Sequence, residues 1–415
     1  MSAPVHCREN IPAGGIRRRL LLAHSDLDAG GGAELYARAI RDRLRGQGHL
    51  VDTLDIHGIR TADADDPAPL PLTLRTLLAL GRLPVLRRRH LLRHALVCRA
   101  LPRFAPGYDA VILSYGEGPA LPCPVLTLRH APALFSTRPA LLAVLGRKSP
   151  LRGPYTRLCR RIAGLPTAPR PDSGPASGSP GHQDHPGDLV LANSAWTAAR
   201  VVEHGLTRRP PAVLYPPVRA IPPATAPVQL ARDPHLILAL GRIVPGKRLE
   251  EAVAILTALR RQGHPARLAI VGRAEGAYAR RLLARLAPHP GLELHPDASP
   301  SRLATLLARA SLGLHCYRQE HFGIAVAEMI TAGILPVVHD GGGVAELVPD
   351  PALRFADPAG ATRRLARLLA LPLTERARMA HCLGQGKALK KALDFEAELD
   401  RVTGPFLARL PGPGA

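Results

Sequence analysis

The residue types most suited to chemistry lie in one short segment, 320–328, which reads EHFGIAVAE. Its two carboxylates, Glu320 and Glu328, are eight residues apart, the first in a loop and the second about one turn into a predicted helix. Gly323 and Ile324 fall near the start of that helix, where backbone N–H groups without helical partners can hold phosphate oxygens. Because Glu328 faces an apolar layer it needs a partner, and a ribose diol is one candidate. The alternative interpretation is an exposed helix face without a ligand.

A second group of residues follows a predicted strand and precedes a predicted helix, in the segment 241–247, which reads GRIVPGK. The glycines, Gly241 among them, let the backbone come close to a ligand. Arg242 and Lys247 place two cations beside the start of the helix. Cations and a helix N-terminus together favour a diphosphate site. A basic loop with no ligand is the alternative.

Both groups need a scaffold, and strands alternate with helices through most of the chain. The pattern predicts strands at 17–23, 50–54, 109–114, 125–128, 188–194, 235–240, 266–271, 292–295, 312–316 and 335–339. It predicts helices at 33–47, 195–203, 249–261, 278–286, 301–310, 324–332 and 344–348. Such alternation is typical of parallel sheets with helices on both faces. Ligands bind to these sheets at the carboxyl ends of the strands.

The length of 415 residues exceeds one ordinary core and favours two α/β domains. We expect a flexible leader, a first Rossmann-like domain, a Pro- and Ala-rich linker, a second Rossmann-like domain, and a C-terminal helix with a tail. Their ranges are 1–16, 17–217, 218–233, 234–390 and 391–415. Two segments of the first domain depart from the alternation: the basic, Leu-rich segment 70–104 and the Pro-, Gly- and Ser-rich loop 163–187.

The formal net charge is +22, which favours anionic partners without choosing among nucleic acid, membrane surface and phosphorylated substrates. No apolar run reaches the length that spans a bilayer, and the first residues carry no signal-peptide core. We therefore expect a soluble or peripheral protein on the cytoplasmic side. The interleaved arginines and leucines of 70–104 fit a helix on an anionic membrane surface. A basic, solvated helix is the alternative.

These motifs, in this order, resemble the retaining GT-B glycosyltransferases of family 4. Glu320 and Glu328 match the E-x-F-G-x-x-x-x-E motif of that family, and the segment 241–247 matches its G-R-x-x-x-x-K loop. The turn at Gly31 and Gly32, followed by Ala33 and Glu34, matches G-G-x-E. The resemblance covers nearly the whole chain apart from the segment 70–104 and the loop 163–187. It implies a GT-B fold, with two doubly wound domains that face each other across a cleft.

The resemblance implies that Arg242 and Lys247 hold the donor diphosphate and stabilise its charge as it leaves. The backbone at Gly323 and Ile324 would assist, together with the Gly31–Gly32 turn.

The remaining roles follow from the same resemblance. Glu328 would accept hydrogen bonds from the ribose, and Phe322 and Gly241 would complete the donor site. Glu320 would face the hexose and steady an oxocarbenium-like centre. His130 follows the strand 125–128 at about the place of a family histidine near the sugar, although a structural role is equally expected of a lone histidine. We expect retention of configuration with no cofactor and no metal.

The amino-acid sequence of several segments is similar to that of the α-1,2-mannosyltransferases that extend lipid-linked oligosaccharides from GDP-mannose. These segments are 192–194, 213–218, 320–324 and 335–339. The likeness implies a GDP-mannose donor and a glycan or lipid-linked acceptor. One alternative is a family 4 transferase that uses a UDP- or ADP-sugar on another acceptor. A second is a non-catalytic, basic membrane- or nucleic-acid-binding protein on a degenerate scaffold. We expect no nucleic acid, because the chain lacks an aromatic-rich platform.

Overall fold

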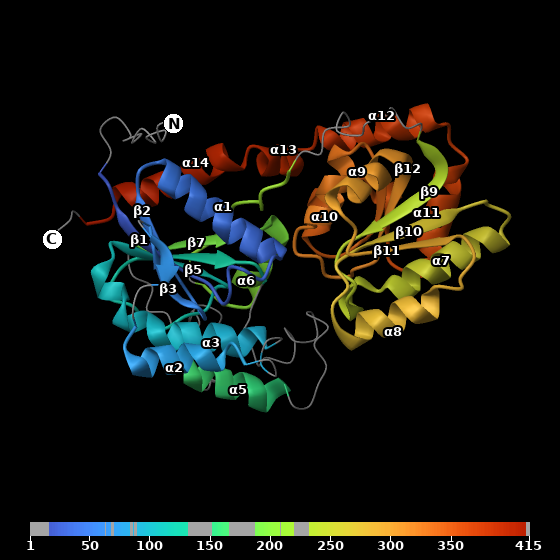
Figure 1. The fold of residues 1–415 in the computed structure, drawn as a ribbon. Helices are drawn as coiled ribbons and strands as arrows, with labels where there is room; N and C mark the ends of the chain where they lie inside the picture. The colour runs from blue at the N-terminus through green and yellow to red at the C-terminus, as the bar shows by residue number, and fades with distance from the viewer. Residues whose placement is uncertain are drawn as a thin grey trace, which may run out of the picture. The chain divides into compact units, whose positions relative to one another are not determined.

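The computed structural model describes residues 16–62, 64–67, 70–83, 86, 89–131, 152–165, 187–207, 209–219 and 232–411. Nearly all of the predicted leader 1–16, and most of the predicted loop 163–187 and linker 218–233, lie outside the described residues. The chain divides into two compact units (Figure 1). The first unit combines Met1–Leu214 with Glu396–Ala415, and the second is Tyr215–Phe395.

In the described part of the first unit, eight strands form one sheet in the order β4-β3-β2-β1-β5-β6-β7-β8. The strands are β1 (Arg19–Ala23), β2 (Leu50–Asp55), β3 (Gly58–Thr61), β4 (Ala64–Pro67), β5 (Ala110–Ser114), β6 (Val125–Arg129), β7 (Leu189–Ala192) and β8 (Ala212–Val213). Strand β1 is parallel to both β2 and β5, whereas β3 is antiparallel to β2 and β4. The strand order reverses at β1, which makes the carboxyl ends of β1 and β5 the topological switch point.

Helices cover both faces of this sheet. They are α1 (Gly32–Gly46), α2 (Leu72–Leu80), α3 (His90–Ala100), α5 (Arg152–Ile162) and α6 (Ala195–Glu203), with short 3-10 helices η1 (Leu101–Arg103) and η2 (Ala105–Gly107). In Figure 1, α1 lies on one side of the sheet and α2, α3 and α5 lie on the other. Leu20, Leu21 and Leu22 of β1 are all fully buried. A continuous apolar strand is what a parallel sheet covered on both faces requires.

The last helix of the chain, α14 (Phe395–Ala408), packs against the first unit along α1 (Figure 1). Arg43 of α1 forms ion pairs with Glu396 at 2.8 Å and with Asp400 at 2.5 Å. Arg18 donates hydrogen bonds to the backbone carbonyls of Leu410 and Pro411. The C-terminal helix therefore closes the first sheet rather than extending the second unit, which the sequence analysis did not foresee.

Neither interpretation of the segment 70–104 as a surface helix describes its second half. The segment forms two helices, and α3 is largely buried. Arg93 of α3 is 3 % exposed and forms an ion pair with Asp26. Only α2 keeps a surface character, with Leu72 at 69 % exposed. The Arg/Leu pattern does not reveal this difference, because the buried acidic partner of Arg93 comes from the distant loop after β1.

In the described part of the second unit, six strands form a parallel sheet in the order β11-β10-β9-β12-β13-β14. The strands are β9 (Asp233–Leu240), β10 (Arg267–Gly272), β11 (Leu292–Pro296), β12 (Ala310–His315), β13 (Leu335–His339) and β14 (Arg354–Phe355). The helices are α7 (Leu249–Arg261), α8 (Gly276–Leu286), α9 (Pro300–Arg309), α10 (Ile324–Thr331), α11 (Pro358–Leu369), α12 (Leu373–Gly384) and α13 (Lys387–Leu393). Two such sheets confirm the predicted doubly wound α/β fold class. The predicted cleft stays a prediction.

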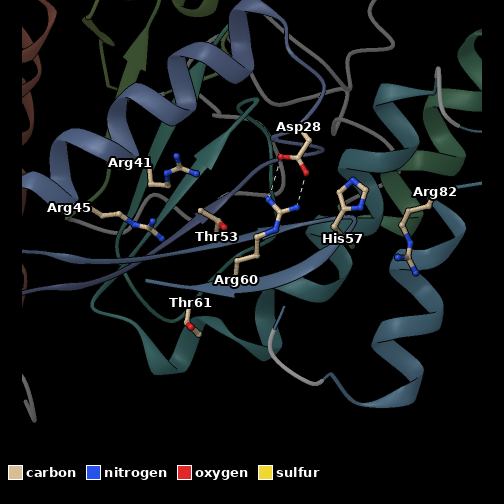
Figure 2. Close-up of a pocket in the computed structure, with 8 residues that line it drawn as sticks. All are labelled: Asp28, Arg41, Arg45, Thr53, His57, Arg60, Thr61 and Arg82. Carbon is tan, nitrogen blue, oxygen red and sulfur yellow. Dashed lines mark hydrogen bonds and ion pairs between the residues drawn. The ribbon is translucent and has the colours of Figure 1, made fainter. Parts of the chain in front are cut away.

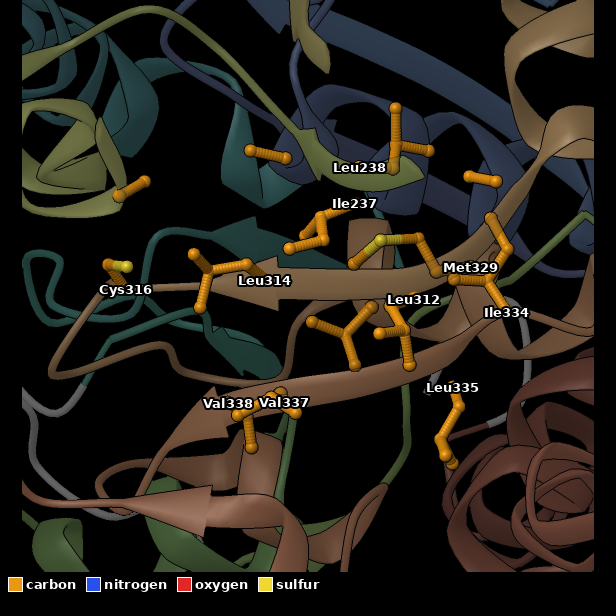
Figure 3. Close-up of a cluster of buried hydrophobic side chains, with 14 of the residues drawn as sticks. Ile237, Leu238, Leu312, Leu314, Cys316, Met329, Ile334, Leu335, Val337 and Val338 are labelled. Carbon is orange, nitrogen blue, oxygen red and sulfur yellow. The ribbon is translucent and has the colours of Figure 1, made fainter. Parts of the chain in front are cut away.

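A close contact between a helix and the sheet sets the position of α10 in the core of the second unit (Figure 3). Met329 of α10 lies over Gly313 of β12, and a Cβ atom added at Gly313 would be 2.8 Å from the Met329 sulfur. Leu312 and Leu335 are register partners on β12 and β13. Because glycine has no side chain, α10 sits close to the sheet. This contact fixes where the first turn of α10 lies.

One predicted helix is wrong in type. Residues 344–348 were expected to form a helix, but Gly343–Glu346 form the 3-10 helix η5. The turn is tied down at its start, where the backbone N–H of Gly343 donates to the carbonyl of Glu320 at 2.7 Å. Two further 3-10 helices, η4 (Pro245–Lys247) and η6 (Pro351–Leu353), precede α7 and β14. No helix in the described residues is both long and apolar enough to cross a bilayer.

Candidate functional site

The switch point of the second unit brings the two sequence motifs together. Strand β9 pairs with β12, and the strand order reverses between them. The segment 241–247 follows β9, and the segment that ends in Glu320 follows β12. Because neighbouring parallel strands end at the same edge of a sheet, the two segments meet there.

Lys247, Glu320 and His315 form the centre of this site. The Lys247 ammonium lies 2.6 Å from Oε2 of Glu320, and Nε2 of His315 lies 3.1 Å from the same oxygen. The Lys247 and Glu320 side chains are 18 % and 16 % exposed, and His315 is 3 % exposed. The Lys247 ammonium also lies 5.0 Å from the ring centroid of Tyr317, at cation–π distance. One carboxylate therefore holds two nitrogen groups at the edge of the sheet.

The surroundings keep Glu320 ionised. Burial by itself raises the pKa of this carboxyl, but the neighbouring Lys247 and His315 outweigh burial and hold the pKa well below its ordinary value. Burial and the charge of Lys247 lower the pKa of His315, although Glu320 opposes this. The group is thus an ammonium, a carboxylate and a buried imidazole, and the carboxylate can act as a fixed negative charge but not as a proton donor near neutral pH.

Glycines hold the backbone of Glu320 in place. Gly342 has a φ of 89°, and a side chain there would collide with the backbone of Glu320. A short parallel bridge joins Glu320 to Gly342. The run Asp340-Gly341-Gly342-Gly343 was not singled out in the sequence, and its glycines were the available signal. The sequence carries no comparable signal for His315, which reads as an ordinary residue of the predicted strand 312–316.

The first part of the segment 241–247 is also built around glycine. Gly241 has a φ of 139°, and a side chain at Gly272 would collide with the carbonyl of Gly241. The two glycines let β9 and β10 approach at their carboxyl ends. Arg242 is exposed and forms no ion pair or hydrogen bond through its side chain with the described residues. Its guanidinium is available to an anionic ligand.

Gly323 gives α10 a distinctive start. It caps the helix with a φ of 101°, and its carbonyl accepts from the N–H groups of Val326 and Ala327, both at 2.9 Å. A Cβ atom at Gly323 would lie 3.4 Å from Cγ of Glu320, so the first turn of α10 begins beside the carboxylate. The N–H of Ile324 makes no backbone hydrogen bond within the described chain. It is one of the free donors of the helix start.

Phe322 and Glu328 have different environments. The Phe322 ring is 2 % exposed and packs with the ring of Tyr215 at a centroid distance of 5.3 Å, so only its backbone is placed to contact a ligand. The Glu328 side chain is half-buried on α10 and accepts no hydrogen bond from the described residues. Burial raises the pKa of Glu328 to about 6, and Arg219 opposes the rise. A carboxylate without a partner is poised to accept from an incoming hydroxyl.

The switch point of the first unit carries a separate polar group. Nε2 of His24, after β1, lies 4.0 Å from Oε1 of Glu34, and Tyr115, after β5, donates from its hydroxyl to the same oxygen at 3.3 Å. His24 and Glu34 are 0 % and 4 % exposed. Tyr115 has a φ of 116°, a left-handed conformation that is uncommon and costly for a tyrosine. The surrounding packing holds that strain in place.

His130 lies beside this group. Its Nε2 is 2.9 Å from the Ser114 hydroxyl, its backbone carbonyl accepts from the Asn193 amide at 3.0 Å, and its ring meets that of Tyr115 at 5.3 Å. Burial, and then the nearby His130 and His94, lower the pKa of His24 far below its ordinary value. His130 therefore belongs to a group of rings, and it is in a different unit from Lys247 and Glu320.

The predicted Gly31–Gly32 turn does begin α1, but its surroundings are not those of a bare anion site. A side chain at Gly31 would collide with the Glu34 carboxylate, which folds back to the start of the helix. A carboxylate there already satisfies the positive end of the helix dipole. Any phosphate at Gly32 would have to lie near that negative charge.

A group with metal-ligand geometry lies in the first unit. One ligand atom each from Asp26, Asp28 and His57 fall within 4.8 Å of one another. The stretch Asp26-Leu27-Asp28 is the sequence signal, and it was not singled out. Both carboxylates already have cationic partners, since Asp26 pairs with Arg93 and Asp28 pairs with Arg60 at 2.7 Å.

Residues 224–385 match the family described as Glycosyl transferases group 1. A protein of Neurospora crassa named GDP-Man:Man(3)GlcNAc(2)-PP-Dol alpha-1,2-mannosyltransferase is 31 % identical over 186 residues, which are 38 % of this chain and 33 % of that protein. The chain thus spans about a third of the length of this curated relative.

Two solved structures share the fold of both units. The glycosyltransferase WaaG, which is involved in lipopolysaccharide biosynthesis, aligns over 93 % of this chain and 100 % of its own with a TM-score of 0.62 and 17 % identity. Sucrose-phosphate synthase of Thermosynechococcus elongatus aligns over 95 % and 99 % with a TM-score of 0.63 and 16 % identity. The fold is therefore that of the GT-B proteins. The match to the group 1 family of glycosyltransferases is confined to residues 224–385, within the second unit.

Proposed function

We propose that the protein is a retaining glycosyltransferase that transfers mannose from GDP-mannose to a glycan or a lipid-linked glycan. The observation that carries the proposal is the Lys247–Glu320 pair, which lies at the switch point beside the first turn of α10. Cleavage of a sugar–phosphate bond places positive charge on the sugar and negative charge on the diphosphate. An ammonium and a carboxylate fixed side by side match that separation of charge.

The diphosphate would lie on the cationic side of the pair. Lys247 and the exposed Arg242 would bind its oxygens, and the free N–H of Ile324 would add a donor from the start of α10. Because the negative charge on the diphosphate grows as the bond to the sugar breaks, these groups stabilise the transition state more than the ground state. We propose that the positive charges of Lys247 and Arg242 replace the charge that a metal ion would supply.

The hexose would lie on the side of Glu320. This carboxylate stays ionised next to Lys247 and His315, so it can accept from sugar hydroxyls and stabilise an oxocarbenium-like centre without giving up a proton. Glu328 has no hydrogen-bond partner in the described chain, and a ribose diol would supply one.

GDP-mannose is proposed because the Neurospora relative carries that donor in its name. A thermal-shift panel with GDP-mannose, UDP-glucose, UDP-N-acetylglucosamine, ADP-glucose and the free nucleotides, with EDTA present, tests the choice. A ligand at about 100 times its Kd should add about 2.7 kcal/mol of stability. We expect the shift with GDP and GDP-mannose, its loss in Lys247→Ala, and its retention in the control Lys390→Ala, which removes an exposed lysine of α13.

Each other outcome has a definite meaning. A thermal shift with UDP- or ADP-sugars alone would be consistent with the proposed mechanism but would contradict GDP-mannose as the donor. A shift that needs Mg²⁺ or Mn²⁺ would overturn the metal-independent part. If no nucleotide shifts the transition, the proposal fails and the non-catalytic, basic binding protein takes its place.

A further inference from the structure

A pocket of about 510 Å³ lies in the first unit, and none of the residues assigned above to the donor lines it (Figure 2). Helix α1 supplies Arg41 and Arg45 to its wall, and the antiparallel strands β2 and β3 supply Thr53 and Arg60. Thr53 and Arg60 are register partners, so their side chains leave the same face of the sheet. The pocket thus lies between a helix and the sheet that it covers.

The charge of the pocket is unbalanced. Four arginines line it, and Asp28 is the one carboxylate among the described residues that do so. Arg41 and Arg45 are one turn apart on α1, a spacing at which like charges repel and destabilise a helix. Arg82 adds a guanidinium at another side of the pocket, and its side chain has no partner in the described chain. Arg41 pairs with Asp42 at 2.7 Å, and Arg60 pairs with Asp28 at 2.7 Å. Part of the positive charge is therefore already offset, and an anion would offset the rest.

The guanidinium groups of Arg45 and Arg60 are held by hydrogen bonds to the protein. Arg45 donates from Nε and Nη2 to the carbonyl of Val51 at 3.0 and 2.6 Å. Arg60 donates from Nη2 to Asp28 at 2.7 Å, which Figure 2 shows as a contact between the two side chains. A planar fork that is already oriented loses little freedom when it binds a phosphate through two parallel hydrogen bonds.

Thr53 places a hydroxyl on the sheet side of the pocket. Thr53 is only 3 % exposed, and its side chain lines the pocket. Its hydroxyl makes no hydrogen bond with any described residue. The hydroxyl is accessible from the pocket rather than sealed in the core, so a ligand oxygen can replace water as its partner. A phosphate oxygen, which accepts hydrogen bonds, is complementary to both the hydroxyl and the arginines.

We propose that this pocket binds the phosphate group of a small phosphorylated ligand, at a site separate from the donor site of the second unit. The inference does not rest on the proposed transferase activity, because none of its residues lies in the second unit. Arg41, Arg60 and the Thr53 hydroxyl bind the phosphate oxygens, and Arg45 completes the cationic wall.

Calorimetric titration of the full-length protein with orthophosphate and with pyrophosphate tests the proposal. The variant Arg41→Gln/Arg60→Gln should weaken binding at least tenfold. The variant Thr53→Val keeps the shape of the side chain and removes the hydroxyl, so it should weaken binding about fivefold. The control Arg99→Gln/Arg103→Gln removes the same charge from two exposed arginines outside the pocket and should change the affinity less than twofold.

The variants also separate this site from the donor site. Lys247→Ala should bind phosphate at the pocket with unchanged affinity. Arg41→Gln/Arg60→Gln should show the same thermal shift with nucleotide sugars as the wild type. Equal losses in the pocket variant and the Arg99/Arg103 control would show a non-specific charge effect and overturn the proposal. So would complete loss of phosphate binding in Lys247→Ala. Circular dichroism of each variant identifies misfolding, and Thr53→Val keeps the test decisive if the arginine variant does not fold.

Phosphate groups occur both on soluble esters and on lipid headgroups, and a vesicle-binding experiment distinguishes the two sources. The protein is sedimented with vesicles of phosphatidylcholine and phosphatidic acid. If the Arg41→Gln/Arg60→Gln variant binds vesicles more weakly than the Arg99→Gln/Arg103→Gln control does, the bound phosphate belongs to a lipid headgroup. If the Arg41→Gln/Arg60→Gln variant still binds vesicles but no longer binds orthophosphate, the bound phosphate belongs to a soluble ester.

Discussion

The two units place polar side chains at the same topological position and surround a carboxylate there with different groups. In the second unit, Lys247 and Glu320 form a charged pair at the switch point between β9 and β12. In the first unit, the switch point between β1 and β5 holds His24 and Tyr115 around one carboxylate. Burial lowers the pKa of His24 so far that the imidazole is neutral near pH 7. One switch point holds a pair of opposite charges, and the other holds neutral rings around a single carboxylate.

The difference shows what each switch point is able to do. A charged pair interacts strongly with charge that develops during bond cleavage, so it suits the donor. Neutral imidazole and phenol groups interact through shape and hydrogen bonds, and they suit hydroxyl groups of a sugar or an acceptor. The strained backbone at Tyr115 indicates that the first unit spends stability to position its rings. Three predictions test this comparison.

The largest effect is expected from the charged pair. Glu320→Gln keeps the size of the side chain and removes its charge, so sugar transfer from the donor that the panel identifies should fall by about 10²–10³ in kcat. Steady-state transfer assays measure it. The control Glu375→Gln removes a partly exposed carboxylate of α12 that pairs with Arg378, and it should leave kcat unchanged. A Glu320→Gln enzyme within a few-fold of the wild type would mean that the charge has no catalytic role.

Mild acid should destabilise the first unit through its neutral histidines. Burial lowers the pKa of His94 to about 4, against 6.5 for an unperturbed group. The unfolded chain therefore binds more protons between these values, and stability is lost as the pH falls from 6.5 to 4. One group contributes about 3 kcal/mol over that range. His315 in the second unit should contribute less, because Glu320 favours its protonated form.

Differential scanning calorimetry between pH 7.5 and pH 4.5 measures this loss, and His94→Gln should flatten the pH dependence of the first transition. The control is His381→Gln, an exposed histidine of α12. If His94→Gln and His381→Gln give the same pH dependence as the wild type, the neutral-ring description of the first unit is wrong.

The smallest effect is expected at Glu328. Its pKa is raised to about 6, so its stabilising contribution is present at low pH and is lost as the pH rises through about 6. Glu328→Gln removes this penalty and should stabilise the protein at pH 8 by about 1 kcal/mol, a value reduced for its partial exposure. The same variant should weaken nucleotide-sugar binding. Denaturation with urea and the thermal-shift panel measure the two effects, and a variant that is both less stable and unchanged in binding would contradict the proposed role.

Much of the local structure could be predicted because it depends on neighbours in the sequence. The helix 249–261 and the strand 335–339 have the predicted bounds, since apolar periodicity and flanking glycines are local signals. The same reasoning selected the segments 241–247 and 320–328. What it could not supply is the pairing of β9 with β12, because strand order depends on the whole sheet.

Errors arose where the environment of a residue is set by distant parts of the chain. The motif around Phe322 does not show that the ring packs against Tyr215, which would leave the backbone of Phe322 to contact a ligand. Arg93 reads as a surface cation, but Asp26 from another loop holds it in the interior. Neither partner is visible from the motif itself, because contacts at long sequence separation leave no local pattern.

The sequence by itself determined the fold class, the order of elements and which loops carry the reactive residue types. The tertiary structure decided which of those residues meet. It placed His315 beside Glu320, returned α14 to the first sheet and gathered the arginines of α1 and β3 around Thr53. The physical reason is that propensity and periodicity act over one or two turns, whereas burial, charge pairing and strand order act across the folded chain.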